Sequence, residues 1–127
     1  MLAQRNPHEA YRRVDFDARV SSATPAQLVA LCYEQLVSAL GSALAAAERG
    51  DNLLKSQSLT RAVSSLTALH LGVSGDESIA VALRQLYEGS RRTVLDNVLA
   101  FDAKAIATIR QDFIDISRAM TASAGTV

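Results

Sequence analysis

Two histidines and one cysteine are the residues of this chain that could support metal binding or nucleophilic catalysis. His8 and His70 lie far apart in the sequence, and Cys32 lies within an apolar segment. Zinc sites need several Cys or His ligands, and di-iron sites in helical bundles need Glu-x-x-His pairs that project inward. The sequence contains neither set. We therefore predict no metal site, no cofactor and no catalytic residue, and we do not expect an enzyme.

Cys32 would need a neighbouring base to act as a nucleophile, and no histidine is near it in the sequence. It lies on the apolar side of its predicted helix, where a thiol packs as a small hydrophobic group, so we assign it to the core together with Leu83. A single cysteine cannot form an internal disulfide, which suits a reducing compartment. The N-terminus shows no apolar core of signal-peptide length, and no run approaches the roughly 20 apolar residues of a spanning helix. We expect a cytoplasmic protein without membrane insertion.

The charge balance argues against a nucleic-acid partner. The 127 residues include 13 Lys or Arg and 13 Asp or Glu, so the net charge is zero, whereas nucleic-acid binders usually carry a basic excess that neutralises phosphates. The pairs Arg12-Arg13 and Arg91-Arg92 are interpreted as solvated helix faces. Apolar residues make up 49% of the chain, and this length fits one domain with a core of its own.

The segments that carry His8, Cys32 and His70 are predicted to be helices. Asn6-Pro7 with Glu9 indicates a helix start, and a short helix with a thin apolar stripe should run to about Arg19. Residues 20–24 form a linker. Start and stop signals then predict four longer helices: Pro25–Arg49 ended by Gly50, about Asn52–Leu71 ended by Gly72, about Glu77–Ala100, and one that Asp102 caps.

Four long helices joined by short connections pack antiparallel, and no segment shows the alternation of a strand. We therefore predict an all-α fold, an antiparallel up-down four-helix bundle with a short extra N-terminal helix. The expected organisation is an N-terminal capping segment and linker at 1–24, the bundle at 25–122 and a flexible tail at 123–127.

The helix predicted at Pro25–Arg49 carries more apolar surface than one packed face needs. A helix with so wide an apolar arc is either central in its bundle or binds a partner on its outer side. Tyr11, Tyr33 and Tyr87 combine an apolar ring with a polar tip, a combination that is common at interfaces. For Tyr33 and Tyr87, a place at the edge of the core is the favoured interpretation.

Several segments, in order and spacing, resemble the FliS family of flagellar export chaperones. The resemblance extends from Asn6 to about Met120. It rests on Asn6-Pro7 with Ala10-Tyr11, Ser22-Ala23-Thr24-Pro25-Ala26-Gln27-Leu28-Val29, Leu31-Cys32-Tyr33-Glu34, Ala47-Glu48-Arg49-Gly50-Asp51, Gly75-Asp76-Glu77-Ser78-Ile79-Ala80, and Leu86-Tyr87-Glu88. Gln35, Gly89, Val98 and Met120 depart from the usual family pattern, which indicates a divergent member.

The resemblance implies a cytoplasmic chaperone that binds the C-terminal segment of flagellin, prevents premature polymerisation and presents the subunit to the flagellar export gate. It also implies that the N-terminal segment can cover part of the client groove. Such binding orders a disordered client, so the contact must be long and apolar. The residues expected at this contact are Tyr11 as cover, with Leu28, Leu31, Tyr33, Leu36 and Tyr87 near the groove.

Two other functions stay open at this point. His70 raises the possibility of a histidine phosphotransfer-type signalling bundle, although Leu69-His70-Leu71-Gly72 lacks the lysine of that family's pattern and stands where a helix ends. The helix dipole alone favours a histidine there. The other alternative is a structural helical bundle that self-associates, in which a homodimer would bury the wide apolar face of the second helix.

Overall fold

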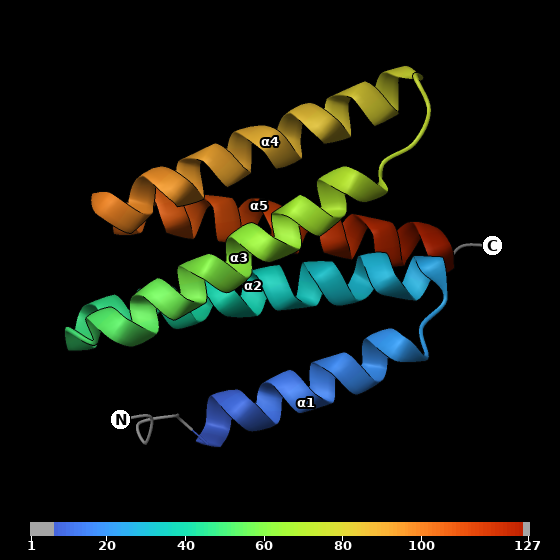
Figure 1. Ribbon diagram of the computed structural model, residues 1–127. Helices are drawn as coiled ribbons and strands as arrows, with labels where there is room; N and C mark the ends of the chain where they lie inside the picture. The colour runs from blue at the N-terminus through green and yellow to red at the C-terminus, as the bar shows by residue number, and fades with distance from the viewer. Residues whose placement is uncertain (1–6, 126–127) are drawn as a thin grey trace. The chain divides into compact units, whose positions relative to one another are not determined.

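The computed structural model describes residues 7–125, with side chains described through Ala122. It consists of five α-helices: α1 (Pro7–Ser21), α2 (Pro25–Arg49), α3 (Asn52–Gly72), α4 (Ser78–Leu99) and α5 (Ala103–Gly125) (Figure 1). Within the described range no residue is in a β-strand. The predicted all-α class is therefore confirmed, and the predicted helix boundaries agree with the observed ones to within about two residues at most ends.

Local side-chain caps explain where the long helices begin. At α2, the Thr24 hydroxyl accepts a hydrogen bond from the Gln27 amide (3.2 Å), and Gln27 Oε1 accepts one from the Thr24 amide (2.8 Å). This reciprocal pair is a capping box, and Pro25 follows at the first helical position. The Asp51 carboxylate accepts from the Leu54 amide at α3 (3.1 Å). The predicted Asn6 cap lies outside the described residues.

The connection between α3 and α4 differs from the sequence-based prediction in one detail. We predicted that Gly72 ends the third helix, and α3 does end there, but the next residue, Val73, is extended and Gly72 is not left-handed. The left-handed glycine of this connection is Gly75, with φ +93°. The Glu77 carboxylate folds against Gly75, and the Arg84 guanidinium donates a hydrogen bond to the Gly75 carbonyl (3.0 Å).

The chain divides into two compact units, Met1–Leu31 and Cys32–Val127. The first contains α1 and the start of α2, and α1 has no buried residue. The boundary falls inside α2, beyond the linker that the sequence indicated. The tail predicted at 123–127 overlaps α5, which is helical through Gly125, and its last two residues lie outside the described part.

The second unit has one hydrophobic core to which α2, α3, α4 and α5 all contribute. Its buried members are Tyr33, Leu36, Ala39, Leu40, Ala43, Leu59, Ala62, Leu66, Leu69, Tyr87, Val94, Ile106, Ile109 and Phe113. Within this unit α3 and α4 lie side by side and run in opposite directions (Figure 1). Removing this apolar surface from water is the main favourable term that holds the helices together.

A buried asparagine fixes the turn between α4 and α5. The Asn97 amide nitrogen donates to the Thr93 carbonyl (2.9 Å), and the Asn97 amide oxygen accepts from the Asp102 amide (2.6 Å). The Asp102 carboxylate in turn accepts from the Lys104 and Ala105 amides (3.0 and 3.3 Å). Because each polar group of this turn has a partner, α5 starts at a defined position and presents Ile106 and Phe113 to the core.

Candidate partner-binding surface

Three aromatic rings meet at the centre of the second unit. The hydroxyls of Tyr33 on α2 and Tyr87 on α4 are 2.7 Å apart, and the Phe113 ring of α5 lies against both, with ring centroids 5.5 Å from Tyr33 and 6.2 Å from Tyr87. Tyr33 is 1% exposed and Tyr87 is 4% exposed. The two hydroxyls therefore satisfy each other in an otherwise apolar site, and they fix α4 relative to α2.

The environment of this centre keeps its ionisable groups neutral. Burial raises the pKa of Tyr33, and the hydrogen bond with Tyr87 raises it further. Burial also raises the pKa of Tyr87, partly offset by its hydrogen bond with Tyr33, and burial raises the pKa of the neighbouring Cys32 thiol. A thiol whose pKa is raised is a poor nucleophile. Cys32 is half-buried and packs against the core, as does Leu83.

The residues that the sequence placed at the partner contact fall into two groups. Tyr11 is 78% exposed, and Leu28 is partly exposed. Leu31, Tyr33, Leu36 and Tyr87 are buried. The structure brings Tyr33 and Tyr87 into direct contact and places Leu36 in the same core cluster. In this conformation the four buried residues are therefore not accessible to a partner.

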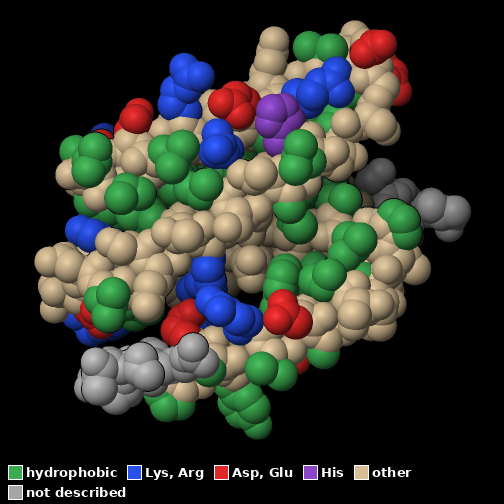
Figure 2. Space-filling model, in the orientation of Figure 1, with side chains coloured by type: hydrophobic (Ala, Val, Ile, Leu, Met, Phe, Trp, Pro, Cys, Tyr) green, Lys and Arg blue, Asp and Glu red, His purple; other side chains and the backbone are tan. Residues whose placement is uncertain are grey.

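Other large apolar side chains, outside the partner contact expected from the sequence, are also exposed. The described ones on α2 to α5 are Val29, Leu53, Leu71, Ile79, Val81, Leu95, Val98, Leu99 and Met120. Leu95, Val98 and Leu99 are neighbours on one face at the end of α4, because residues three and four apart adjoin on a helix. Figure 2 shows hydrophobic side chains on the surface at this end of α4. Leu99, at 94% exposure, is the most exposed of them.

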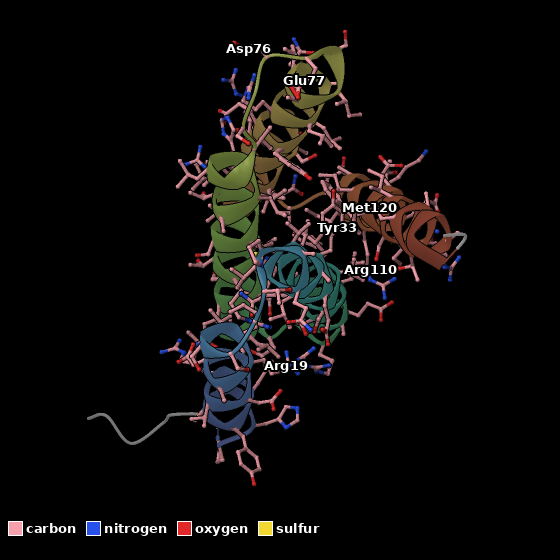
Figure 3. The ribbon with its side chains drawn as sticks, turned by 90° about the vertical axis from the view of Figure 1, so that its right-hand side faces the viewer. Arg19, Tyr33, Asp76, Glu77, Arg110 and Met120 are labelled. Carbon is pink, nitrogen blue, oxygen red and sulfur yellow. The ribbon has the colours of Figure 1, made fainter. Side chains whose placement is uncertain are left out.

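A second feature that the sequence analysis did not identify joins α2 to α5. The Arg110 guanidinium Nε donates a hydrogen bond to the Val37 carbonyl of α2 (3.3 Å). The guanidinium lies against Gly41, where an added Cβ would lie 3.1 Å from Arg110 Nε, a tight contact. Figure 3 shows Arg110 in the angle between α2 and α5. A glycine in the middle of a long helix is the sequence signal for such a close approach.

His70 takes part in a charged cluster between α3 and α4. Its Nδ1 lies 3.6 Å from Glu88 Oε1, and the same carboxylate group lies 3.9 Å from the guanidinium groups of Arg91 and Arg92. Arg91 also donates to the Thr67 hydroxyl (3.0 Å). A carboxylate beside Nδ1 orients the imidazole ring. His70, Glu88, Arg91 and Arg92 form a partly exposed ion-pair cluster of the kind that is common on helix surfaces.

Metal binding and membrane insertion were also considered. Within the described residues, no three His, Cys, Asp or Glu side chains are grouped so as to hold a metal ion. The expectation that no segment approaches the length and composition of a spanning helix was wrong, because α2 meets both criteria. Core helices of soluble proteins meet them as well, and the part of α2 in the second unit contributes Tyr33, Leu36 and Leu40 to the core.

The sequence model described as flagellar protein FliS matches residues 7–122 of this chain. This chain belongs to the FliS family. The flagellar secretion chaperone FliS of Salmonella typhimurium is 31% identical to it over 114 residues, which cover 87% of this chain and 84% of that protein. The match begins at the first residue of α1 and ends within α5, so all five helices are part of the FliS region. The resemblance inferred from the sequence is confirmed.

Proposed function

We propose that this FliS-family protein is a flagellar export chaperone that binds the C-terminal segment of flagellin, prevents its premature polymerisation and delivers it to the export apparatus. The observation that carries the proposal is the family match over residues 7–122. A chaperone of this kind needs no reacting group, so we propose that the protein is not an enzyme and needs no cofactor. We propose that it acts in the cytoplasm, without membrane insertion or a nucleic-acid partner.

The architecture we propose for this function is an antiparallel up-down four-helix bundle at 25–122, preceded by a capping segment and linker at 1–24 and followed by a flexible tail at 123–127. The short α1 suits a displaceable cover because it has no buried residue. A helix of 15 residues with so little packing is marginally stable by itself. Its displacement would therefore cost little free energy when a client binds.

The client surface that we propose combines exposed and buried residues. Tyr11, on the proposed cover, is exposed, and Leu28 is partly exposed. Leu31, Tyr33, Leu36 and Tyr87 are proposed to hold the shape of the surface above them, because they are buried in the free chain. A disordered client that folds on the chaperone loses conformational entropy, and a long apolar contact offsets this cost. A homodimer would use the same apolar surface and would compete with the client.

The test is calorimetric titration of the purified full-length protein with the C-terminal segment of flagellin from the same organism. We expect one segment to bind per chaperone with a large negative heat-capacity change, because apolar surface is buried and the client folds. A peptide of the same composition in scrambled order is the matched control. Sedimentation at the same concentrations measures whether a homodimer dissociates as the segment binds.

Two outcomes would contradict the proposal. One is that no binding is detected when both partners are soluble at concentrations of roughly tens of micromolar, which would still reveal a weak specific complex. The other is equal binding of the scrambled peptide, which would show unspecific apolar contact. Export-gate delivery is tested separately by asking whether the purified complex binds the gate's cytoplasmic domain more tightly than the free chaperone does.

A further inference from the structure

Arg110 of α5 is a half-buried arginine whose charge the described chain does not balance. Its Nε donates to the Val37 carbonyl, a neutral acceptor that belongs to the backbone of α2. Among the described residues, no carboxylate lies within ion-pair distance of its guanidinium. A guanidinium is always charged near neutral pH and presents a planar set of N–H donors, most of which this one hydrogen bond leaves available.

The acidic residues of the same helix are directed elsewhere. The Asp115 carboxylate accepts a hydrogen bond from the Gln111 amide (2.9 Å), and both residues are exposed. Asp112 is also exposed and lies almost opposite Arg110 around the helix, because two residues correspond to about 200° of rotation. Neither aspartate forms an ion pair with Arg110.

Partly buried apolar side chains lie near Arg110 on both helices. Val37 of α2 and Ile116 of α5 are partly buried and pack against the core. Ile114, one helical turn after Arg110, is half-buried, and Met120 further along α5 is 40% exposed. Figure 3 shows Arg110 on the side of α5 that faces α2. A charged donor set within an apolar surface selects a partner that supplies both a carboxylate and apolar side chains.

We propose that the α2–α5 junction around Arg110 binds an apolar segment of the export client through a carboxylate of that segment, which accepts hydrogen bonds from the Arg110 guanidinium. This inference rests on the proposed chaperone function. Gly41 lies directly beneath the guanidinium, which reaches past it to the Val37 carbonyl of α2. The contact selects an acidic position in the client, which an apolar groove alone does not do.

The experiment is a double-mutant cycle with the full-length protein and the flagellin C-terminal segment as probe. Each Asp or Glu of the segment is replaced in turn by Asn or Gln, and each peptide is titrated against the wild type and against Arg110→Gln. For one acidic position, we expect the amide peptide to bind the wild type about tenfold to a hundredfold more weakly, the range for a hydrogen bond between charged groups. The same peptide should lose little or nothing further on Arg110→Gln.

Arg118→Gln is the matched control, because Arg118 is an exposed arginine on the same helix. It should leave binding of every peptide unchanged. Arg110→Lys keeps the charge but not the planar donor set, so it should recover only part of the affinity. Because the peptide substitutions leave the chaperone intact, the result does not depend on the stability of Arg110→Gln.

The outcomes separate this inference from the proposed function. The inference would be overturned if the wild type binds the segment and neither the peptide substitutions nor the Arg110 substitutions weaken binding. The chaperone function would then still stand. Equal losses with Arg110→Gln and Arg118→Gln would also overturn it, since they would indicate only long-range attraction. A wild type that binds no flagellin segment would overturn the proposed function itself.

Discussion

Helices α1 and α5 both begin near a predicted cap and both carry apolar residues at helical spacing, yet only one is anchored in a core. α5 buries Ile106, Ile109 and Phe113, whereas α1 buries no residue. In α1, Tyr11 and Val14 are 78% and 65% exposed. The comparison shows that amphipathic spacing forms a helix in both places, but the stability of each helix depends on what its apolar face contacts.

The largest loss of stability is expected when the Phe113 side chain of α5 is truncated. Phe113→Ala removes a fully buried ring that contacts Tyr33 and Tyr87. We expect the free energy of unfolding to fall by about 3–5 kcal/mol, from lost burial and from the cavity left behind. Urea unfolding followed by circular dichroism measures it. A loss below about 1 kcal/mol, the level of ordinary single substitutions, would show that the centre is not closely packed.

The hydroxyl pair should give the next largest effect. Tyr33→Phe or Tyr87→Phe leaves the other hydroxyl buried without its partner, so each should cost about 1–3 kcal/mol of unfolding free energy. The double substitution should cost less than the sum of the two, because neither hydroxyl is then left unpaired. Denaturant unfolding of the three variants measures the coupling. Additive losses would mean that the two hydroxyls do not interact.

Alkaline pH should destabilise the same centre. Burial raises the pKa of Tyr33 and Tyr87, so the folded chain holds these protons at a pH where the unfolded chain has released them. Stability should therefore be unaffected by this pair at neutral pH and should fall as the pH rises above about 10, the ordinary tyrosine value.

This is measured in a Tyr11→Phe background, which leaves only these two tyrosines. Tyrosinate absorbance should appear together with the loss of helical circular dichroism. Absorbance that appears while the helical signal is intact would contradict a buried pair.

The smallest effect is expected in α1. Tyr11→Ala removes a ring that is 78% exposed. The free energy of unfolding should therefore change by less than about 0.5 kcal/mol, the range of surface substitutions. Thermal unfolding beside Phe113→Ala makes the contrast direct. A loss comparable to that of Phe113→Ala would show that α1 is anchored in the folded chain as firmly as α5.

The class of the fold and the helix boundaries could be predicted from local sequence signals. Thr24, Gly50, Asp51 and Asp102 act on amides or backbone angles within a few residues, so their signals are readable without tertiary information. The family was also readable, because the ordered segments around Pro25, Tyr33 and Tyr87 are specific when taken together.

Which apolar residues face outward depends on the tertiary structure. The apolar arc of α2 is so wide that periodicity could not separate its core side from its outer side. Tyr33 and Leu36 were therefore expected near a groove, although both are buried. Arg110 could not be predicted at all, because its position depends on how closely α5 approaches α2 at Gly41. Caps act over one turn of a helix, whereas burial depends on side chains that are distant in the sequence and meet only in the folded chain.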